Sequence, residues 1–166
     1  LCAIKIVHLE STIRQRREME RQKLFYEEIL NNMPADIAVF DAGHRYLYLN
    51  PMAVKDPELR KWIVGKTDED YAAYRNKPLL MAERRRKIFN SVIESKKLKN
   101  WEEKLTQPDG SAKYVMRNMF PVLNKDNEVS LVIGYGLDIT NIKNIQQQIE
   151  QSEKKYRDVI DNSLAI

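Results

Sequence analysis

The sequence is poor in the side chains that bind metals or form disulfides. Cys2 is the one cysteine among 166 residues, and His8 and His44 are the two histidines. A lone cysteine cannot form an internal disulfide or a cysteine-based zinc site, which indicates a reducing compartment. The sequence has no set of His, Cys and Asp at the spacing of a metal site, so we expect no metal.

Long apolar runs are also missing. No stretch reaches the roughly 20 apolar residues that a membrane-spanning helix needs. Residues 1–9 are apolar enough to be the tail of such a helix, or the last strand of a preceding repeat, and we favour the strand. No signal peptide is visible. We therefore expect a cytoplasmic domain, with membrane contact of the parent protein only through segments outside this sequence.

The sequence lacks the motifs of the common enzyme sites. Gly134-Tyr135-Gly136 has neither the third glycine nor the helix start that a dinucleotide-binding loop requires. We find no P-loop and no nucleophile beside a plausible base. This chain is therefore not expected to be an enzyme, which leaves the activity of the parent protein open.

The charge balance is mildly basic, with a net charge of +4 and an isoelectric point near 9.1. The basic runs at 14–17, 84–87 and 96–99 lie in helical patterns interspersed with glutamate, which is typical of a solvated face. No nucleic-acid-binding motif accompanies them. We expect no nucleic-acid partner.

The most informative pattern is an echo between the two ends of the chain. Residues 26–32 (YEEILNN) match 156–162 (YRDVIDN), apolar with apolar and polar with polar, at an offset of 130. The same offset lays residues 1–10 over 131–140. A fixed period is the mark of a repeat array, so the chain is predicted to be one module of a longer protein.

Periodicity and turn residues predict the secondary structure. Helix formers at 10–32 end before Pro34, and a second helix is predicted at 78–97. Strands are predicted at 37–40, 46–49, 100–106, 113–123 and 129–137, short helices between 52 and 77, and a last helix at 141–162. This order predicts an α+β fold with an antiparallel sheet.

The order, together with several short motifs, resembles a PAS domain, the sensory module of signalling proteins. The motifs lie at 29–34, 48–51, 63–67, 108–111 and 136–140. The resemblance implies a five-stranded antiparallel sheet with short helices on one face, flanked by signalling helices. It divides the chain into a connector at 1–32, a PAS domain at 33–140, and a linker helix with the start of the next repeat at 141–166.

The resemblance also implies a function in signal relay. The expected parent is a bacterial multi-PAS protein, most simply a sensor histidine kinase of a two-component system, with adjacent PAS and kinase domains as partners. One alternative is a ligand-free dimerisation spacer. Another is a parent that is a cyclic-dinucleotide enzyme or a transcription regulator.

Asp138-Ile139-Thr140 stands where the last strand meets the last helix. Thr140 is predicted to accept a hydrogen bond from the first helical turn, with Asp138 adding negative charge there. In PAS domains this triplet couples the sheet to the output helix. The alternative is an ordinary helix cap. Only Lys143 is near enough in sequence to supply a cation to Asp138.

The last helix carries a heptad pattern. Apolar residues recur at steps of three and four, which is the spacing on which two helices supercoil. We therefore expect a homodimer through the flanking helices, the alternative being that the stripe packs on its own sheet. The predicted seam residues are Ile142, Ile145, Ile149, Tyr156 and Val159.

A ligand pocket is expected between the sheet and the helix at 78–97. Haem would require a histidine there, but we read His44 as a solvated turn residue, and Cys2 lies far from where a flavin photosensor needs its cysteine. No cofactor is identified, haem and covalent flavin are not expected, and a small organic ligand is compatible with the pocket. Asn118 either orients such a ligand or bonds to backbone. The candidate lining residues are Tyr71, Ile88, Val92, Met116, Asn118, Phe120 and Tyr135.

Overall fold

The computed structural model describes residues 2–164 of the chain, and the side chains of residues 9–163. Its strands form one antiparallel sheet in the order β2-β1-β5-β4-β3. The predicted α+β class with a five-stranded antiparallel sheet is therefore confirmed. The elements are α1 (Cys2–Asn32), β1 (Asp36–Asp41), β2 (Tyr46–Leu49), α2 (Pro57–Ile63), α3 (Asp68–Tyr74), α4 (Leu80–Ser95), β3 (Lys99–Thr106), β4 (Ala112–Leu123), β5 (Val129–Asp138) and α5 (Thr140–Leu164).

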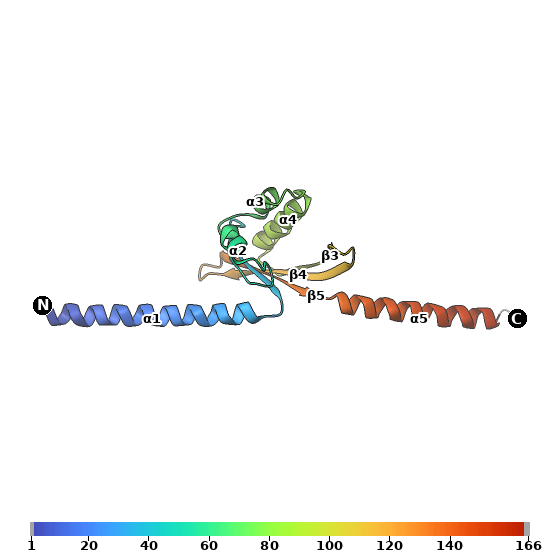
Figure 1. Ribbon diagram of the computed structural model, residues 1–166, viewed down its shortest axis with the longest axis horizontal. Coiled ribbons are helices and arrows are strands. Elements are labelled where there is room, and N and C mark those ends of the chain that lie inside the picture. The colour runs from blue at the N-terminus through green and yellow to red at the C-terminus, as the bar shows by residue number, and fades with distance from the viewer. Residues whose placement is uncertain (1, 165–166) are drawn as a thin grey trace.

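The elements divide into a compact body and two projecting helices. Helices α2, α3 and α4 gather on one face of the sheet, whereas α1 and α5 extend away from it in opposite directions (Figure 1). Within the described residues, no helix combines the length and the apolar character needed to cross a bilayer.

The core lies between the sheet and α4. Side chains alternate between the two faces of a strand, and the inward positions of β1, β4 and β5 include Phe40, Met119 and Val132, which are buried. Phe89 and Val92 of α4 pack against them. The Phe40 and Phe89 rings meet edge to face, with centroids 5.9 Å apart.

Local signals explain where the short helices begin. Thr67 caps α3 in a capping box, because its hydroxyl accepts from the Asp70 N–H while the Asp70 carboxylate accepts from the Thr67 N–H. Asp56 caps α2 in a similar way. Helix α4 ends where Lys96 turns into the left-handed region at φ 52°.

The first helix is longer than predicted. Residues 2–9 belong to α1, so the prediction of a strand there is wrong. Residue 1 of the predicted strand lies outside the described residues. No glycine or proline precedes Pro34, so nothing in the sequence interrupts a helix that starts there. A strand would also require a neighbouring strand to satisfy its backbone.

We predict that Phe89→Ala lowers the free energy of unfolding by about 3–5 kcal/mol, since it removes a fully buried ring and leaves a cavity. Urea denaturation followed by circular dichroism measures this change. Met81→Ala on the same helix is the matched control. Met81 is 48% exposed, so the change is expected within about 0.5 kcal/mol. Equal losses in the two variants would contradict this assignment of the core.

Candidate functional site

A cavity of about 150 Å³ lies between the sheet and the helices on its covered face. Apolar residues form most of its wall, including Phe40, Leu49, Ala53, Val54, Ile63 and Met119. Charged and hydroxyl-bearing side chains complete it, namely Asp36, Tyr46, Asp68, Tyr71, Arg85 and Arg117. A cavity of this volume is large enough for a molecule the size of benzene.

The seven predicted pocket residues separate into three groups. Tyr71, Asn118 and Tyr135 line the cavity. Val92 belongs to the core beside it, and Ile88 packs against that core. Met116 and Phe120 do not line the cavity, because Arg117 and Met119 occupy the inward positions of β4 and alternation turns their neighbours to the other face.

Asn118 follows the same alternation. Alternation assigns its side chain to the face opposite Arg117 and Met119, while the residue as a whole is 8% exposed and borders the cavity. Its amide nitrogen lies 3.5 Å from the Met116 carbonyl oxygen. This contact is of the backbone-bonding kind, and the ligand-orienting role of Asn118 stays a prediction.

His44 is not a solvated turn residue, and that expectation is wrong. The residue has a φ of 66° and is fully buried. Its ring stacks on Phe89 at 4.2 Å, and its Nε2 lies 3.4 Å from an Asp68 carboxylate oxygen. The turn folds over the helices because Arg86 donates to the Gly43 carbonyl oxygen at 3.1 Å and pairs with Glu69 at 2.8 Å.

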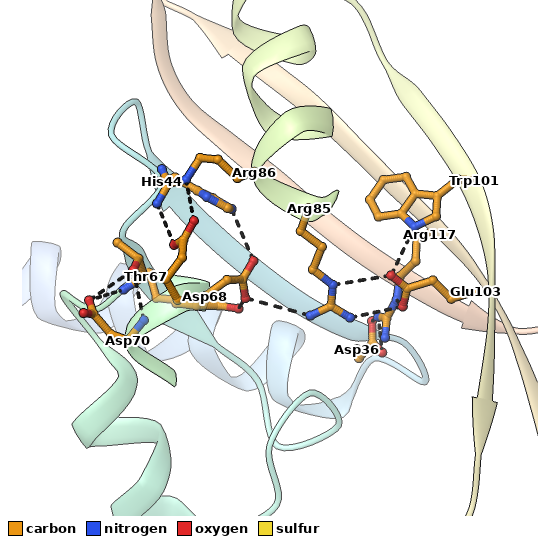
Figure 2. Close-up of polar contacts among 12 residues, drawn as sticks. Asp36, His44, Thr67, Asp68, Asp70, Arg85, Arg86, Trp101, Glu103 and Arg117 are labelled. Carbon is orange, nitrogen blue, oxygen red and sulfur yellow. Dashed lines mark hydrogen bonds and ion pairs between the residues drawn. The ribbon is translucent and has the colours of Figure 1, made fainter. Parts of the chain in front are cut away.

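A chain of ion pairs runs along the polar side of the cavity, as Figure 2 shows. Arg117 binds Asp36 of β1 at 2.6 Å and Glu103 of β3 at 3.0 Å. Glu103 in turn binds Arg85 of α4 at 3.1 Å, and Arg85 lies 3.8 Å from Asp68 of α3. The network therefore ties the sheet to two of the helices that cover it.

The buried carboxylates of this network stay ionised. Burial raises the pKa of Glu103, but Arg85, Arg117 and the indole N–H of Trp101 outweigh it and lower the pKa to about 2. The pKa of Asp68 is also lowered, since His44, Arg85 and Tyr46 outweigh the effect of its burial. Burial and the adjacent Asp68 raise the pKa of Tyr46, so Tyr46 remains a hydrogen-bond donor to that carboxylate.

The predicted coupling triplet joins β4, β5 and α5. The Asp138 carboxylate accepts from the Thr140 hydroxyl at 2.6 Å and from the Thr140 N–H at 3.0 Å. The Thr140 hydroxyl oxygen accepts from the Tyr114 N–H at 3.0 Å, and the Ile139 N–H donates to the Tyr114 carbonyl oxygen at 2.9 Å. We call these four hydrogen bonds the β5–α5 clamp.

Two details of the clamp differ from expectation. The Thr140 hydroxyl binds β4 backbone instead of an N–H of the first helical turn, because Thr140 is the first residue of α5 and follows the capping position. Asp138 pairs with Lys113 at 3.3 Å. Lys143, the one cation that follows Asp138 closely in sequence, lies one helical turn along α5 and pairs with Glu102 of β3 at 2.8 Å.

Comparison with known proteins agrees with this geometry. A family profile described as the PAS fold matches residues 30–144, which is more than half of the chain. The chain belongs to the PAS family. This PAS domain is the sensory type of module that its sequence motifs indicated.

Several solved structures share the fold at low sequence identity. The PAS domain of BvgS from Bordetella pertussis is 19% identical, with a TM-score of 0.59 over 81% of this chain and 98% of that one. VqmA of Vibrio cholera, solved with ligand and DNA, is 19% identical, with a TM-score of 0.55 over 74% and 51%. A sensory box histidine kinase from Vibrio cholerae is 13% identical, with a TM-score of 0.51 over 76% and 98%.

A sequence relative is the protein y4lL of Sinorhizobium fredii (strain NBRC 101917 / NGR234), which is 27% identical over 149 residues. The alignment covers 86% of this chain and 17% of y4lL. The chain therefore corresponds to a small part of that relative's length.

We predict that Glu103→Gln destabilises the PAS domain by up to about 3 kcal/mol at pH 7, because the folded-state pKa near 2 lies well below the ordinary value of 4.5. A carboxylate whose pKa is lower in the folded state than in the unfolded state contributes its full stabilisation at any pH above the unfolded-state pKa. The difference in the free energy of unfolding between the wild type and Glu103→Gln should thus shrink as the pH falls from about 4.5 to about 2. Urea denaturation across this pH range measures it.

Glu102→Gln is the control for this experiment. Glu102 lies on the same strand but is partly exposed, where its ion pair with Lys143 is screened by water. We expect a loss of no more than about 1 kcal/mol. A pH-independent loss in Glu103→Gln would show that the ionised carboxylate is not what matters.

Proposed function

We propose that this PAS domain senses a small organic molecule in its cavity and relays the state of the cavity to α5, as part of a bacterial sensor histidine kinase. One observation carries the proposal: the cavity and the clamp share two strands. Arg117 and Met119 of β4 and Gly134 of β5 line the cavity, and the same two strands are hydrogen-bonded to the start of α5.

The clamp supplies a physical route for the relay. Strands β4 and β5 pair along nearly their whole lengths, from the Val115–Asp138 pair to the Leu123–Val129 pair. A ligand that shifts either strand at the cavity therefore also shifts the end where Asp138 and Thr140 sit. Because Thr140 is the first residue of α5, the first turn of the helix moves with the strands.

Dimerisation would convert this movement into an output. The seam residues of α5 are exposed in the single chain, with Ile142, Ile145 and Ile149 between 53% and 56% accessible. Tyr156 and Val159 continue the seam and are exposed as well. A second copy of α5 would bury this stripe in a coiled coil, and α1 also carries exposed apolar residues that would face a partner.

A histidine kinase is the parent that we favour, with the adjacent PAS and kinase domains as intramolecular partners. A Vibrio cholerae sensor histidine kinase is among the proteins that share the fold. VqmA, solved with DNA, shares it too, which keeps a transcription regulator as the alternative parent.

A ligand-free dimerisation spacer is the second candidate function. The ion-pair network favours it, because three charged groups on the cavity wall, Asp36, Arg85 and Arg117, already have partners of opposite charge within the domain. Groups paired in this way require no ligand to satisfy them, although the Asp68 Oδ2 has no hydrogen-bond partner within the described residues.

We predict that native mass spectrometry of gently purified protein shows a reproducible adduct of small-molecule mass that Ala53→Phe abolishes. Ala53 lines the cavity, so a phenyl ring there would fill the space. Met52→Phe is the matched control, since Met52 is 54% exposed and the adduct should persist. Absence of an adduct in the wild type, together with an unchanged or raised melting temperature of Ala53→Phe, would favour the spacer.

For the dimer, we predict that Ile145→Asp or Ile149→Asp weakens self-association at least tenfold. Each change removes a side chain whose burial contributes about 1.5–3 kcal/mol. Sedimentation equilibrium measures the dissociation constant. Gln147→Asp places the same charge on the opposite face of α5 and is expected to leave it unchanged. Equal weakening by all three substitutions would exclude this seam.

A further inference from the structure

The cavity-facing ion pair between Asp36 and Arg117 lies directly on a glycine of the output strand. Asp36 of β1 and Arg117 of β4 are the register partners of Gly136 on its two sides. The two side chains meet above Gly136, where the Arg117 Nη1 binds the Asp36 oxygens at 2.6 and 2.7 Å.

Gly136 is the residue that makes this arrangement possible. A Cβ at this position would lie 2.9 Å from the Asp36 carboxyl carbon, and closer still to its Oδ1 and to the Arg117 Nη1. Side-chain atoms do not approach so closely, so any larger residue would push the ion pair or β5 out of place. Gly134 on the same strand differs, because a Cβ there would meet the Phe40 ring at 3.3 Å.

Arg117 of this ion pair also has a second partner, Glu103 of β3. Glu103, which is 5% exposed, binds the Arg117 Nε at 3.0 Å and connects it to Arg85 of α4. The position of Arg117 above Gly136 thus depends on α4 as well as on the sheet. Asp36 and Arg117 both line the cavity, so an occupant of the cavity is able to contact the pair.

Gly136 precedes Asp138 of the clamp by two residues, on a strand that leads straight into α5. We infer that Asp36 and Arg117 are positioning residues for the output: their ion pair, seated on Gly136, sets where the end of β5 lies and thereby how α5 leaves the domain. This inference rests on the proposed relay function, and names the contact through which the cavity acts on the strand.

The test measures the direction of α5 by pulsed electron spin resonance in the 166-residue chain. Spin labels are placed at Lys61→Cys on α2 and Gln151→Cys on α5, both exposed positions, in a Cys2→Ser background. Labelled chain is diluted with excess unlabelled chain, so that each dimer reports one intrachain distance. Thr140→Val, which removes the hydroxyl of the clamp, is the positive control for movement of α5.

We expect Gly136→Ala to shift the distance distribution by more than its wild-type width, because the added Cβ separates Asp36 from Arg117. Ser130→Ala changes an exposed residue of the same strand that does not line the cavity, and should leave the distribution in place. Asp36→Ala removes the ion pair and should also shift it. In a background that carries both Asp36→Ala and Arg117→Ala, which removes both side chains that the added Cβ would meet, Gly136→Ala should have no further effect.

The inference is overturned if Gly136→Ala leaves the distribution unchanged, or if its effect persists in the background that lacks both the Asp36 and the Arg117 side chains. Should Gly136→Ala fail to fold by circular dichroism, Asp36→Ala decides alone, and an unchanged distribution then overturns the inference. No ligand is needed for this readout. A negative result in the spin-label experiment therefore says nothing about whether a ligand binds in the cavity. Likewise, the absence of an adduct says nothing about whether Asp36 and Arg117 position α5.

Discussion

The arrangement of helices on the sheet depends on one buried carboxylate. Glu103 of β3 accepts from Arg85 of α4, from Arg117 of β4 and from the Trp101 indole N–H. Removing such a carboxylate from water is costly, and attraction to two guanidinium groups offsets that cost only in one geometry. The interaction therefore fixes where α4 lies relative to β3 and β4 more than it adds to stability.

This constraint explains why the cavity has two different sides. Phe89 and Val92 pack α4 onto the sheet at its apolar side. At its polar side Arg85 reaches Glu103 and Asp68, and Arg117 reaches Asp36. Charged groups hold defined partners at defined distances, whereas an apolar wall can adjust to fill a void. The polar side is thus the part of the cavity whose geometry is coupled to the surrounding elements.

Much of the fold was predictable because its signals are local. Alternating apolar residues placed the predicted strand boundaries within two residues of those observed. The end of the last strand near Asp138 and the helix that follows it were predicted from local signals of the same kind. Such features depend on neighbours in sequence, which a single chain displays.

The cavity was harder to predict because it depends on contacts between distant residues. Strand β4 carries apolar side chains on both faces, so alternation alone did not say whether Met116 or Met119 points inward. The burial of His44 depends on Phe89, 45 positions later in the sequence. One signal for the network was present: Arg85 sits within the apolar stripe of α4, and an arginine there requires a buried acid such as Glu103.

The geometry of α5 shows why a few bonds at one end matter. Helix α5 spans 25 residues, which at 1.5 Å per residue makes it about 37 Å long. Its apolar seam is exposed along its length, so its direction in the single chain is set by its first turn, through the clamp and the Lys143–Glu102 ion pair. For a rigid helix of that length, a rotation of about 5° at the first turn moves the far end by about 3 Å. Neighbouring seam positions are three or four residues apart, which is about 4.5–6 Å along the helix, so this displacement is at least half of that spacing. Small changes at the clamp are therefore sufficient to alter how two such helices meet.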